Sequence, residues 1–244
     1  MLTIRRDKEI HREEGGWFTA RWHFSFDHYR DPDNDGFGAM RVFNDDRLVP
    51  GAIWPLHPHE DVEGLTYVVE GSFRHEDSVG GAPGPLPAGA VQRMTLGSGA
   101  LHSEQNASRG EPMRFIQIWI LPDTPDLEPG VEQRVFTRED RAGRLLKVIG
   151  PEGGGVVRVH QDAGVYVASL APGDRVEHRL GPGRGAYGYL IDGRASFDGE
   201  QVATGDAAKV TGQPSLAIAA EAPSELILVD VPMRFERVGV WAGR

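Results

Sequence analysis

The hydrophobic residues of this chain gather in short runs that glycine and proline separate. The runs are rich in valine, isoleucine, leucine, tyrosine and phenylalanine, and they include residues 65–69, 115–120, 156–159, 165–170 and 225–231. Many short runs of this kind, with turn signals between them, predict an all-β sandwich or barrel. Apolar positions with helical spacing are scarce. We therefore expect only short helices, around residues 139–142 near a central linker and at the C-terminus.

A proline-rich, acidic segment without a periodic pattern separates two halves of the chain. It covers residues 123–135 and reads Asp-Thr-Pro-Asp-Leu-Glu-Pro-Gly-Val-Glu-Gln-Arg-Val. Such a composition is typical of a connection between domains. We expect an N-terminal domain over residues 1–122 and a C-terminal domain over residues 136–244.

The two halves also resemble each other. A hydrophobic strand that ends in an acidic residue and a glycine occurs at residues 67–71 and again at residues 189–193. A second shared block, in which a glycine turn precedes a strand, occurs at residues 88–95 and 204–211. Because the two blocks recur in the same order, we expect an internal duplication.

The composition excludes several classes of function. The chain of 244 residues has 26 basic and 36 acidic side chains, and its net charge of −10 disfavours direct binding to nucleic acid. It has no cysteine, which excludes disulfides, thiolate zinc sites, iron–sulfur clusters and cysteine nucleophiles. Neither a signal peptide nor an apolar segment of membrane-spanning length is recognisable. We expect a cytoplasmic protein that binds neither nucleic acid nor membrane.

Two pairs of metal-ligating residues are the strongest chemical signal. His57 and His59 are separated by one proline, and His102 and Glu104 are separated by one serine. Side chains two residues apart point to the same face of a strand, so each pair can present two ligands to one side. Neighbouring strands would place three imidazoles and one carboxylate around a divalent ion such as Fe, Mn, Co, Ni or Zn. An octahedral ion bound in this way keeps two positions open.

Several other polar residues have competing interpretations. His75 and Asp77 either orient a metal ligand or form a hydrogen-bonded pair at the surface. Glu63 is either a carboxylate that accepts a proton near the metal or a polar residue at the mouth of the barrel. We interpret His23 and His28, which lack ligand spacing, as structural or exposed residues.

Two further features have alternatives of their own. Residues 31–36 resemble the start of an EF-hand loop, but Val42 occupies the position of its bidentate glutamate, so we interpret them as an acidic turn. Trp54, Phe115 and Trp119 are either core residues or the lining of an apolar pocket.

The surroundings of the ligand pairs resemble the pirin family, a branch of the cupin superfamily, over residues 24–122. The residues that carry the resemblance are Asp31, Asp33, Gly36, Gly38, Asn44, Asp45, Asp46, His57, His59, Glu63, Tyr67, Gly71, His75, Asp77, Gly89, Gly97, Gly99, His102 and Glu104. The resemblance implies a bicupin, in which two jelly-roll-like antiparallel β-barrels pack face to face. The C-terminal half matches only by its pattern.

The resemblance also implies the metal and its ligands. Pirins hold one divalent ion, usually iron, in the N-terminal barrel alone, so we expect Fe(II) first, with Mn, Co, Ni, Zn or Cu as alternatives. The expected ligands are His57, His59, His102 and Glu104. Many other cupins use a glutamate shortly after the first histidine pair, which here would be Glu63. In the second half, the repeat puts Ile218 and Ala220 at the positions of His102 and Glu104, so we expect no metal there.

Two functions follow from the resemblance. In the first, the protein is an enzyme of the quercetin 2,3-dioxygenase type, which opens the ring of a flavonol with O2 and releases CO. Glu104, or alternatively Glu63, would take the proton of the flavonol hydroxyl. In the second, it is a non-enzymatic, iron- or redox-sensing regulator that binds a transcription factor or a metabolic enzyme. Because two barrels in one chain already cover each other, we expect a monomer.

Overall fold

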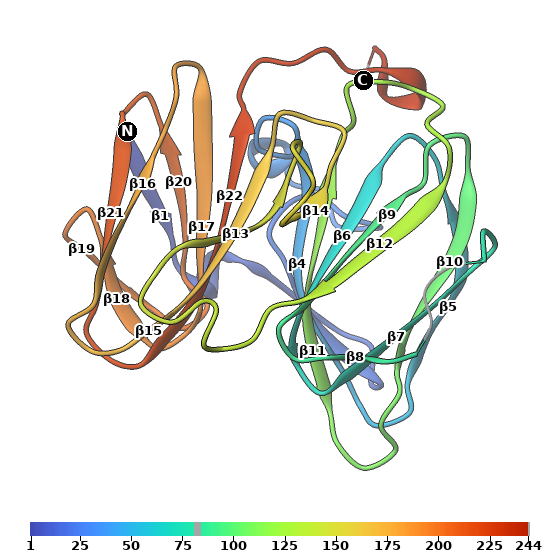
Figure 1. Cartoon of the computed structure of the whole chain (residues 1–244), viewed down its shortest axis with the longest axis horizontal. Coiled ribbons are helices and arrows are strands. Elements are labelled where there is room, and N and C mark those ends of the chain that lie inside the picture. The colour runs from blue at the N-terminus through green and yellow to red at the C-terminus, as the bar shows by residue number, and fades with distance from the viewer. Residues whose placement is uncertain (81–83, 244) are drawn as a thin grey trace.

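The computed structural model describes residues 1–80 and 84–243, and it consists mainly of β-strands. Figure 1 shows two lobes side by side, with the first half of the chain mainly in the right lobe and the second half mainly in the left. Each lobe contains a seven-stranded sheet and a four-stranded sheet. The prediction of an all-β fold with two similar parts is therefore confirmed.

The N-terminal lobe contains the candidate metal ligands. Its larger sheet has the order β12 (Gly130–Val135), β9 (Ala90–Thr95), β6 (Glu63–Glu70), β11 (Met113–Ile120), β4 (Met40–Leu48), β3 (Phe18–Trp22) and β2 (His11–Glu14). Its smaller sheet has the order β5 (Ile53–His59), β10 (Ala100–Asn106), β7 (Ser72–Asp77) and β8 (Leu86–Pro87).

The C-terminal lobe repeats this arrangement. Its larger sheet has the order β1 (Leu2–Arg5), β20 (Ala207–Thr211), β17 (Arg184–Asp192), β22 (Ser224–Pro232), β15 (Gly164–Leu170), β13 (Leu146–Gly150) and β14 (Val157–Arg158). Its smaller sheet has the order β16 (Arg175–Arg179), β21 (Ser215–Ala220), β18 (Arg194–Phe197) and β19 (Glu200–Ala203).

The same glycine turns connect the sheets in both lobes. Gly71 follows β6 at a φ of +81°, and Gly193 follows β17 at a φ of +108°. A Cβ atom would lie 2.5 Å from the carbonyl oxygen of Pro112 at the first position, and 2.4 Å from that of Pro223 at the second. Only glycine fits both this backbone conformation and this close approach. The matching turns and strand orders support the predicted duplication.

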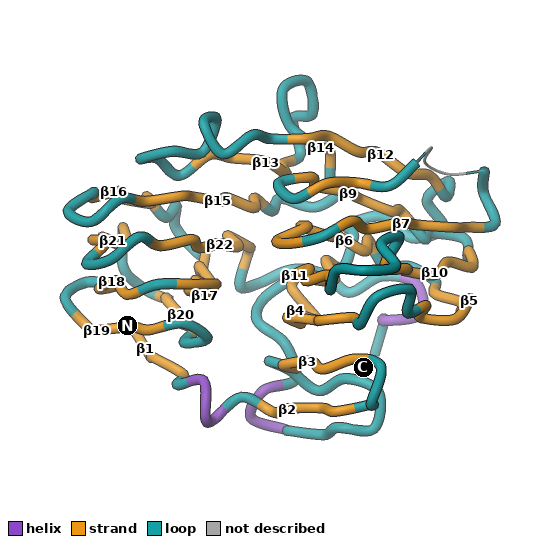
Figure 2. Tube along the Cα trace, turned by 90° about the horizontal axis from the view of Figure 1, so that it is seen from below, coloured by secondary structure: helices purple, strands orange, loops and turns teal. Residues whose placement is uncertain are grey.

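Each lobe takes one strand from beyond the expected boundary of its domain. β1 pairs with β20 of the C-terminal lobe, and the chain then passes through the 3-10 helix η1 (Asp7–Glu9) to β2 in the other lobe, as Figure 2 shows. β12, which we expected in the linker, pairs with β9 in the N-terminal lobe. The division of the chain at residues 122 and 136 stays a prediction.

The structure corrects two details of the predicted fold. Within the described residues no hydrogen-bonded ladder joins the two sheets of a lobe, so each lobe is an open sandwich rather than a closed barrel. The helix expected at residues 139–142 is wrong: Asp140 accepts hydrogen bonds from the N–H and hydroxyl of Thr137, at 2.8 and 2.9 Å, and this local bonding forms a turn.

The remaining short elements agree with the sequence. The C-terminal helix is the 3-10 helix η3 (Gly239–Trp241), and η2 (Pro32–Asn34) lies in the predicted acidic turn, where the Asp31 carboxylate accepts a bond from the N–H of Asp33. The described part of the chain contains no helix with the length and hydrophobicity needed to cross a membrane.

An apolar core joins the two seven-stranded sheets. It includes Phe43, Ile116 and Ile118 from the N-terminal lobe and Tyr187, Ile227 and Val229 from the C-terminal lobe. Two tyrosines at corresponding positions of the duplication bond across this core. Tyr67 donates to Glu225 and Tyr189 donates to Asp45, both at 2.5 Å.

A buried ion pair strengthens the same interface. Arg114 donates through Nε and Nη2 to both oxygens of Asp45, at 2.8 and 2.7 Å, and through Nη1 to Asp192 of the other lobe at 2.9 Å. Burial opposes ionisation of Asp45, but the hydrogen bonds and charge of Arg114 keep its pKa lowered. The carboxylate therefore depends on Arg114 as its counter-ion.

Replacing Arg114 is expected to destabilise the fold strongly. Arg114→Met leaves the buried Asp45 carboxylate with only Arg21, at 3.6 Å, as a counter-ion, which should lower the free energy of unfolding by about 3 kcal/mol. Arg47→Met is the matched control, because Arg47 is more exposed and lies 3.6 Å from Glu70, so its loss should cost about 1 kcal/mol or less. Urea denaturation measures both variants, and equal losses would contradict this role of Arg114.

The stability of the interface should also depend on pH through His23. Its ring is fully buried, with Nδ1 2.7 Å from the Tyr187 hydroxyl, and burial followed by the charge of Arg5 lowers its pKa to about 3. The unfolded chain takes up a proton near pH 6.5 while the folded chain does not. The stabilisation is therefore complete above pH 6.5 and is lost as the pH falls toward 3, by about 2 kcal/mol at pH 5.

Urea denaturation of His23→Gln at pH 7 and pH 5 checks this dependence. The variant should lose less stability between the two pH values than the unmodified protein does. If the unmodified protein and His23→Gln lose the same free energy, His23 does not carry the effect.

Candidate metal centre

The interiors of the two sandwiches differ in chemistry. The C-terminal lobe is filled by a continuous apolar cluster that includes Leu190, Phe197, Ile218 and Ala220. The predicted correspondence of Ile218 with His102 is wrong by two residues: Ile218 pairs with Phe197 as Glu104 pairs with His75, so Ile218 corresponds to Glu104. That the C-terminal lobe holds no metal stays a prediction.

Strand β5 presents two imidazoles to the inside of the N-terminal lobe. His57 and His59 alternate with Pro58, so both rings lie on one face. His57 pairs with His102 and Trp54 pairs with Glu104, so β5 has one residue more than β10 between these two pairs. This extra residue forms a β-bulge in β5. Pro55 lies within this bulge and has no N–H for the ladder.

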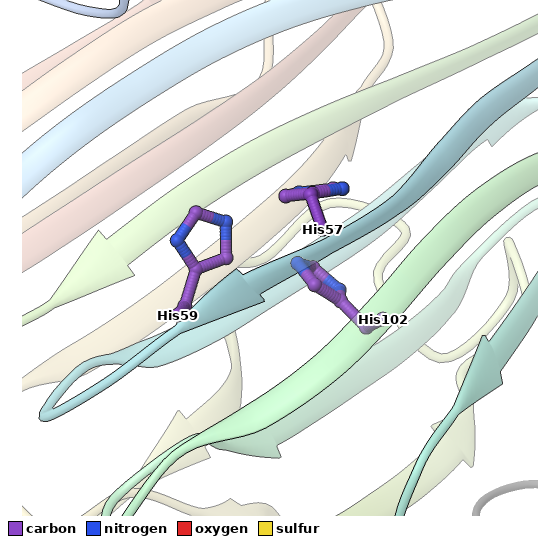
Figure 3. Close-up of side chains that lie close together, drawn as sticks. All are labelled: His57, His59 and His102. Carbon is purple, nitrogen blue, oxygen red and sulfur yellow. The ribbon is translucent and has the colours of Figure 1, made fainter.

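Strand β10 brings the third imidazole into place. His102 lies directly opposite His57 in the antiparallel register. The ring centroid of His102 is 4.5 Å from that of His57 and 5.1 Å from that of His59, and His57 and His59 are 4.8 Å apart. One ligand atom from each residue lies within 4.8 Å of the others, and Figure 3 shows the three rings converging from the two strands.

The three imidazoles fit a divalent metal ion. The Nδ1 atom of His57 lies 2.7 Å from the carbonyl oxygen of Pro55, so it donates there and leaves Nε2 with a lone pair. The Nε2 atoms of His59 and His102 are buried and find no hydrogen-bond partner among the described residues. Burial and neighbouring imidazoles lower the pKa of His59 to about 4 and that of His102 to about 2. Neutral imidazoles with free lone pairs are the form that binds metals.

Glu104 lies beside this cluster. Its Oε1 atom is 3.5 Å from Nδ1 of His102 and accepts a hydrogen bond of 3.0 Å from Gln117. Burial raises the pKa of the carboxyl group to about 7, although the Gln117 bond opposes this shift. The compact group of ligand atoms contains the three histidines without Glu104. Its role as the fourth ligand stays a prediction.

Glu63 has a different environment. It lies on β6, where Oε1 accepts a bond of 2.8 Å from the Thr95 hydroxyl and lies 2.8 Å from Nδ1 of His160. Its Oε2 accepts a bond of 2.6 Å from the N–H of His160. Both oxygens thus bind residues outside the histidine cluster, one of them in the segment that follows the linker. The structure does not bring Glu63 together with Glu104.

His75 and Asp77 form a buried pair, so their interpretation as a surface pair is wrong. Nε2 of His75 lies 2.9 Å from Asp77, and its Nδ1 lies 3.0 Å from the side-chain nitrogen of Gln92. Burial lowers the pKa of His75. Its ring centroid is 5.6 Å from that of His102, and β7 pairs directly with β10. The pair therefore packs behind the cluster and restrains His102.

A cavity of about 490 Å³ opens onto the histidines. Its lining includes Phe26, Trp54, His57, His59, Glu104, Phe115, Gln117, Trp119 and Trp241. The volume is in the range of pockets that bind small molecules. The pocket interpretation of Trp54, Phe115 and Trp119 is confirmed, while Phe115 also packs in an apolar cluster. Asp61 holds the C-terminal segment over the cavity by accepting a bond of 3.0 Å from the N–H of Val240.

Our sequence reasoning missed Asp46 and Gln117 as residues of the cavity. Asp46 is buried, lines the cavity, and has one oxygen without a hydrogen-bond partner among the described residues. Burial, with Asp45 and Glu104 nearby, raises its pKa well above the usual value. The available signal was the run of three polar residues 44–46 that follows Val42 and Phe43, because buried polar residues in a strand often serve a site.

Comparison with known proteins places the chain in a family. Residues 4–120 match the family described as Pirin, and residues 148–231 match the Quercetinase C-terminal cupin domain. A protein of Escherichia coli strain K12 named quercetin 2,3-dioxygenase is 36% identical over 234 residues, which cover 95% of this chain and 99% of the relative. The chain belongs to the pirin family. A pirin-like protein of Caulobacter vibrioides is also 36% identical, over 88% of this chain and 93% of its own length.

Solved structures agree with the pirin fold. YhhW from Escherichia coli superposes with a TM-score of 0.90 at 34% identity, covering 97% of this pirin and all of that chain. A second structure of the bacterial pirin YhhW, in complex with nickel(II), gives a TM-score of 0.87 at 34% identity and covers 95% and 99% of the two chains. The family comparison and the histidine cluster together support metal binding by this pirin.

Loss of one imidazole is expected to remove the metal. His57→Ala and His102→Ala each leave two of the three imidazoles, so the purified, dialysed variants should lose the ion at this cluster. Elemental analysis by mass spectrometry measures the ion per chain. The control is His160→Gln, because His160 contacts Glu63 outside the cluster, and it should retain the metal content of the unmodified protein. Equal metal content in His57→Ala and the control would contradict the site.

Proposed function

We propose that this pirin is a metal-dependent dioxygenase that opens the ring of a flavonol-like aromatic substrate with O2 and releases CO. The observation that carries the proposal is a cavity of about 490 Å³ that is lined by two imidazoles of the histidine cluster and by several aromatic side chains. The relative in Escherichia coli whose name is quercetin 2,3-dioxygenase supports the same reaction class.

His57, His59, His102 and Glu104 would hold the ion, and Fe(II) is our first candidate, followed by Mn, Co, Ni, Zn and Cu. Imidazole and carboxylate ligands suit all of these ions. A bound divalent ion would lower the pKa of a substrate hydroxyl that approaches it. Gln117 would position Glu104, because it donates the hydrogen bond of 3.0 Å that orients this carboxyl group.

The cavity suits a flat aromatic molecule. Trp54, Phe115 and Trp119 supply apolar faces, and the Trp119 ring lies 4.5 Å from that of His59 in an edge-to-face arrangement. Aromatic substrates pack well in such a setting, since offset and edge contacts between rings are favourable. The wall that contains Trp119 would thus hold the substrate beside the imidazoles and exclude water.

Glu104 is our candidate for the proton acceptor. It lines the cavity that the substrate would enter, whereas both oxygens of Glu63 accept bonds from Thr95 and His160. A general base must reach the proton that it removes, which favours Glu104 over Glu63. The physiological substrate and the cytoplasmic location stay predictions.

Anaerobic quercetin titration followed by addition of air tests the function. The iron-loaded protein should bind quercetin with a shift of the flavonol absorption band, and air should then bleach the band and release CO. His57→Ala should show no turnover, and Glu104→Gln should lower kcat by about 100-fold or more. His160→Gln is the control with unchanged turnover.

Two outcomes would contradict the proposal. Full flavonol cleavage by metal-free His57→Ala would show that the histidine cluster is not the catalytic centre. Quercetin binding without CO release, in a protein that holds its metal, would favour the alternative of a regulator. A pull-down that changes with the oxidation state of the iron would then be the next measurement.

A further inference from the structure

A second group of metal-ligating side chains lies on the outer sheet edge, away from the histidine cluster. His11 and Glu13 are two residues apart on the edge strand β2, so their side chains share one face. His28 reaches them from the loop that follows β3. One ligand atom from each of the three residues lies within 4.8 Å of the others.

The distances within this group fit a bound ion. The Oε2 atom of Glu13 lies 3.1 Å from Nε2 of His11 and 3.2 Å from Nε2 of His28. Zinc binds nitrogen and oxygen at about 2.0–2.1 Å, and the ligand atoms of such a tetrahedral ion are about 3.3 Å apart. The two distances from the Glu13 oxygen are therefore close to the spacing that a tetrahedral ion imposes, and the two ring nitrogens lie within 4.8 Å of each other.

The other nitrogen of His28 has the partner that metal-bound histidines use. Its Nδ1 atom lies 3.3 Å from Oδ2 of Asp27. When Nδ1–H donates to this carboxylate, Nε2 carries a lone pair that faces a carboxylate oxygen of Glu13. A metal ion between these two atoms would accept both lone pairs.

The surrounding aromatic residues hold the imidazoles in place. His11 stacks on Tyr29, with ring centroids 4.1 Å apart and planes 12° from parallel. The buried Trp22 contacts both imidazoles, with its centroid 5.5 Å from that of His11 and 5.3 Å from that of His28. Asp27 has a φ of +47°, an uncommon value that fixes the direction of the loop.

We propose that His11, Glu13 and His28 form a second site for a divalent metal of the zinc, nickel or copper type, with Asp27 orienting His28. Two imidazoles and one carboxylate leave a position for water or another ligand. The loop that contains His28 also contributes Phe26, Asp27 and Arg30 to the wall of the main cavity. An ion at the second site therefore fastens this wall to strand β2.

Titration with ZnCl2 by isothermal calorimetry tests the site. The unmodified protein should bind one zinc ion more than His28→Gln, whose exposed side chain can be replaced without disturbing the fold. Asp27→Asn should keep the site but weaken its affinity by about 10–100-fold, the effect expected when a partner of a ligating histidine is lost. His57→Ala should lose the other site and retain this one, which separates the two.

Cobalt(II) supplies a second measurement in the same set of proteins. His57→Ala loaded with CoCl2 should show the visible absorption of a bound cobalt ion, and the combined variant His57→Ala and His28→Gln should not. The control His160→Gln should bind zinc like the unmodified protein. If His28→Gln and the unmodified protein bind zinc with the same number of sites and the same affinity, the proposal is wrong.

Discussion

The antiparallel register between β5 and β10 is the constraint on which the site depends. It sets His102 opposite His57, and the alternation along β5 adds His59 to the same face. A shift of one residue would turn every side chain of a strand to its other face, so this register alone decides whether the imidazoles meet. The C-terminal lobe has the same strand order, but Ile218 and Ala220 fill its interior.

Strand β4 links the interface between the lobes to the cavity. Neighbouring residues point to opposite faces, so Asp45 binds Arg114 and Tyr189 at the interface while Asp46 lines the cavity. Because they face different surroundings, the two carboxyl groups have different pKa values. Arg114 keeps the pKa of Asp45 low, and burial raises the pKa of Asp46. A change in lobe packing would therefore reach the cavity through a single strand.

The sequence predicted what depends on local periodicity. The all-β fold, the duplication and the convergence of His57 and His59 follow from alternation and glycine turns. Features that depend on distant pairing were beyond it: the bulge opposite Glu104, the contact of Glu63 with His160, and the position of β1 in the other lobe. His28 lies in a loop, whereas the two residues that it meets, His11 and Glu13, lie on strand β2, so the sequence shows no ligand spacing among them.

The exchange of the first strand has a consequence for how the molecule assembles. Leu2 lies opposite Val210, so a strand from the first part of the sequence completes a sheet whose partner strand is made much later. Until β20 is made, β1 has unpaired backbone groups, which are a site for unwanted association between chains. The C-terminal lobe therefore completes its sheet only with a strand from the first part of the chain. A C-terminal fragment produced alone would expose β20 as an unpaired edge strand, which favours aggregation.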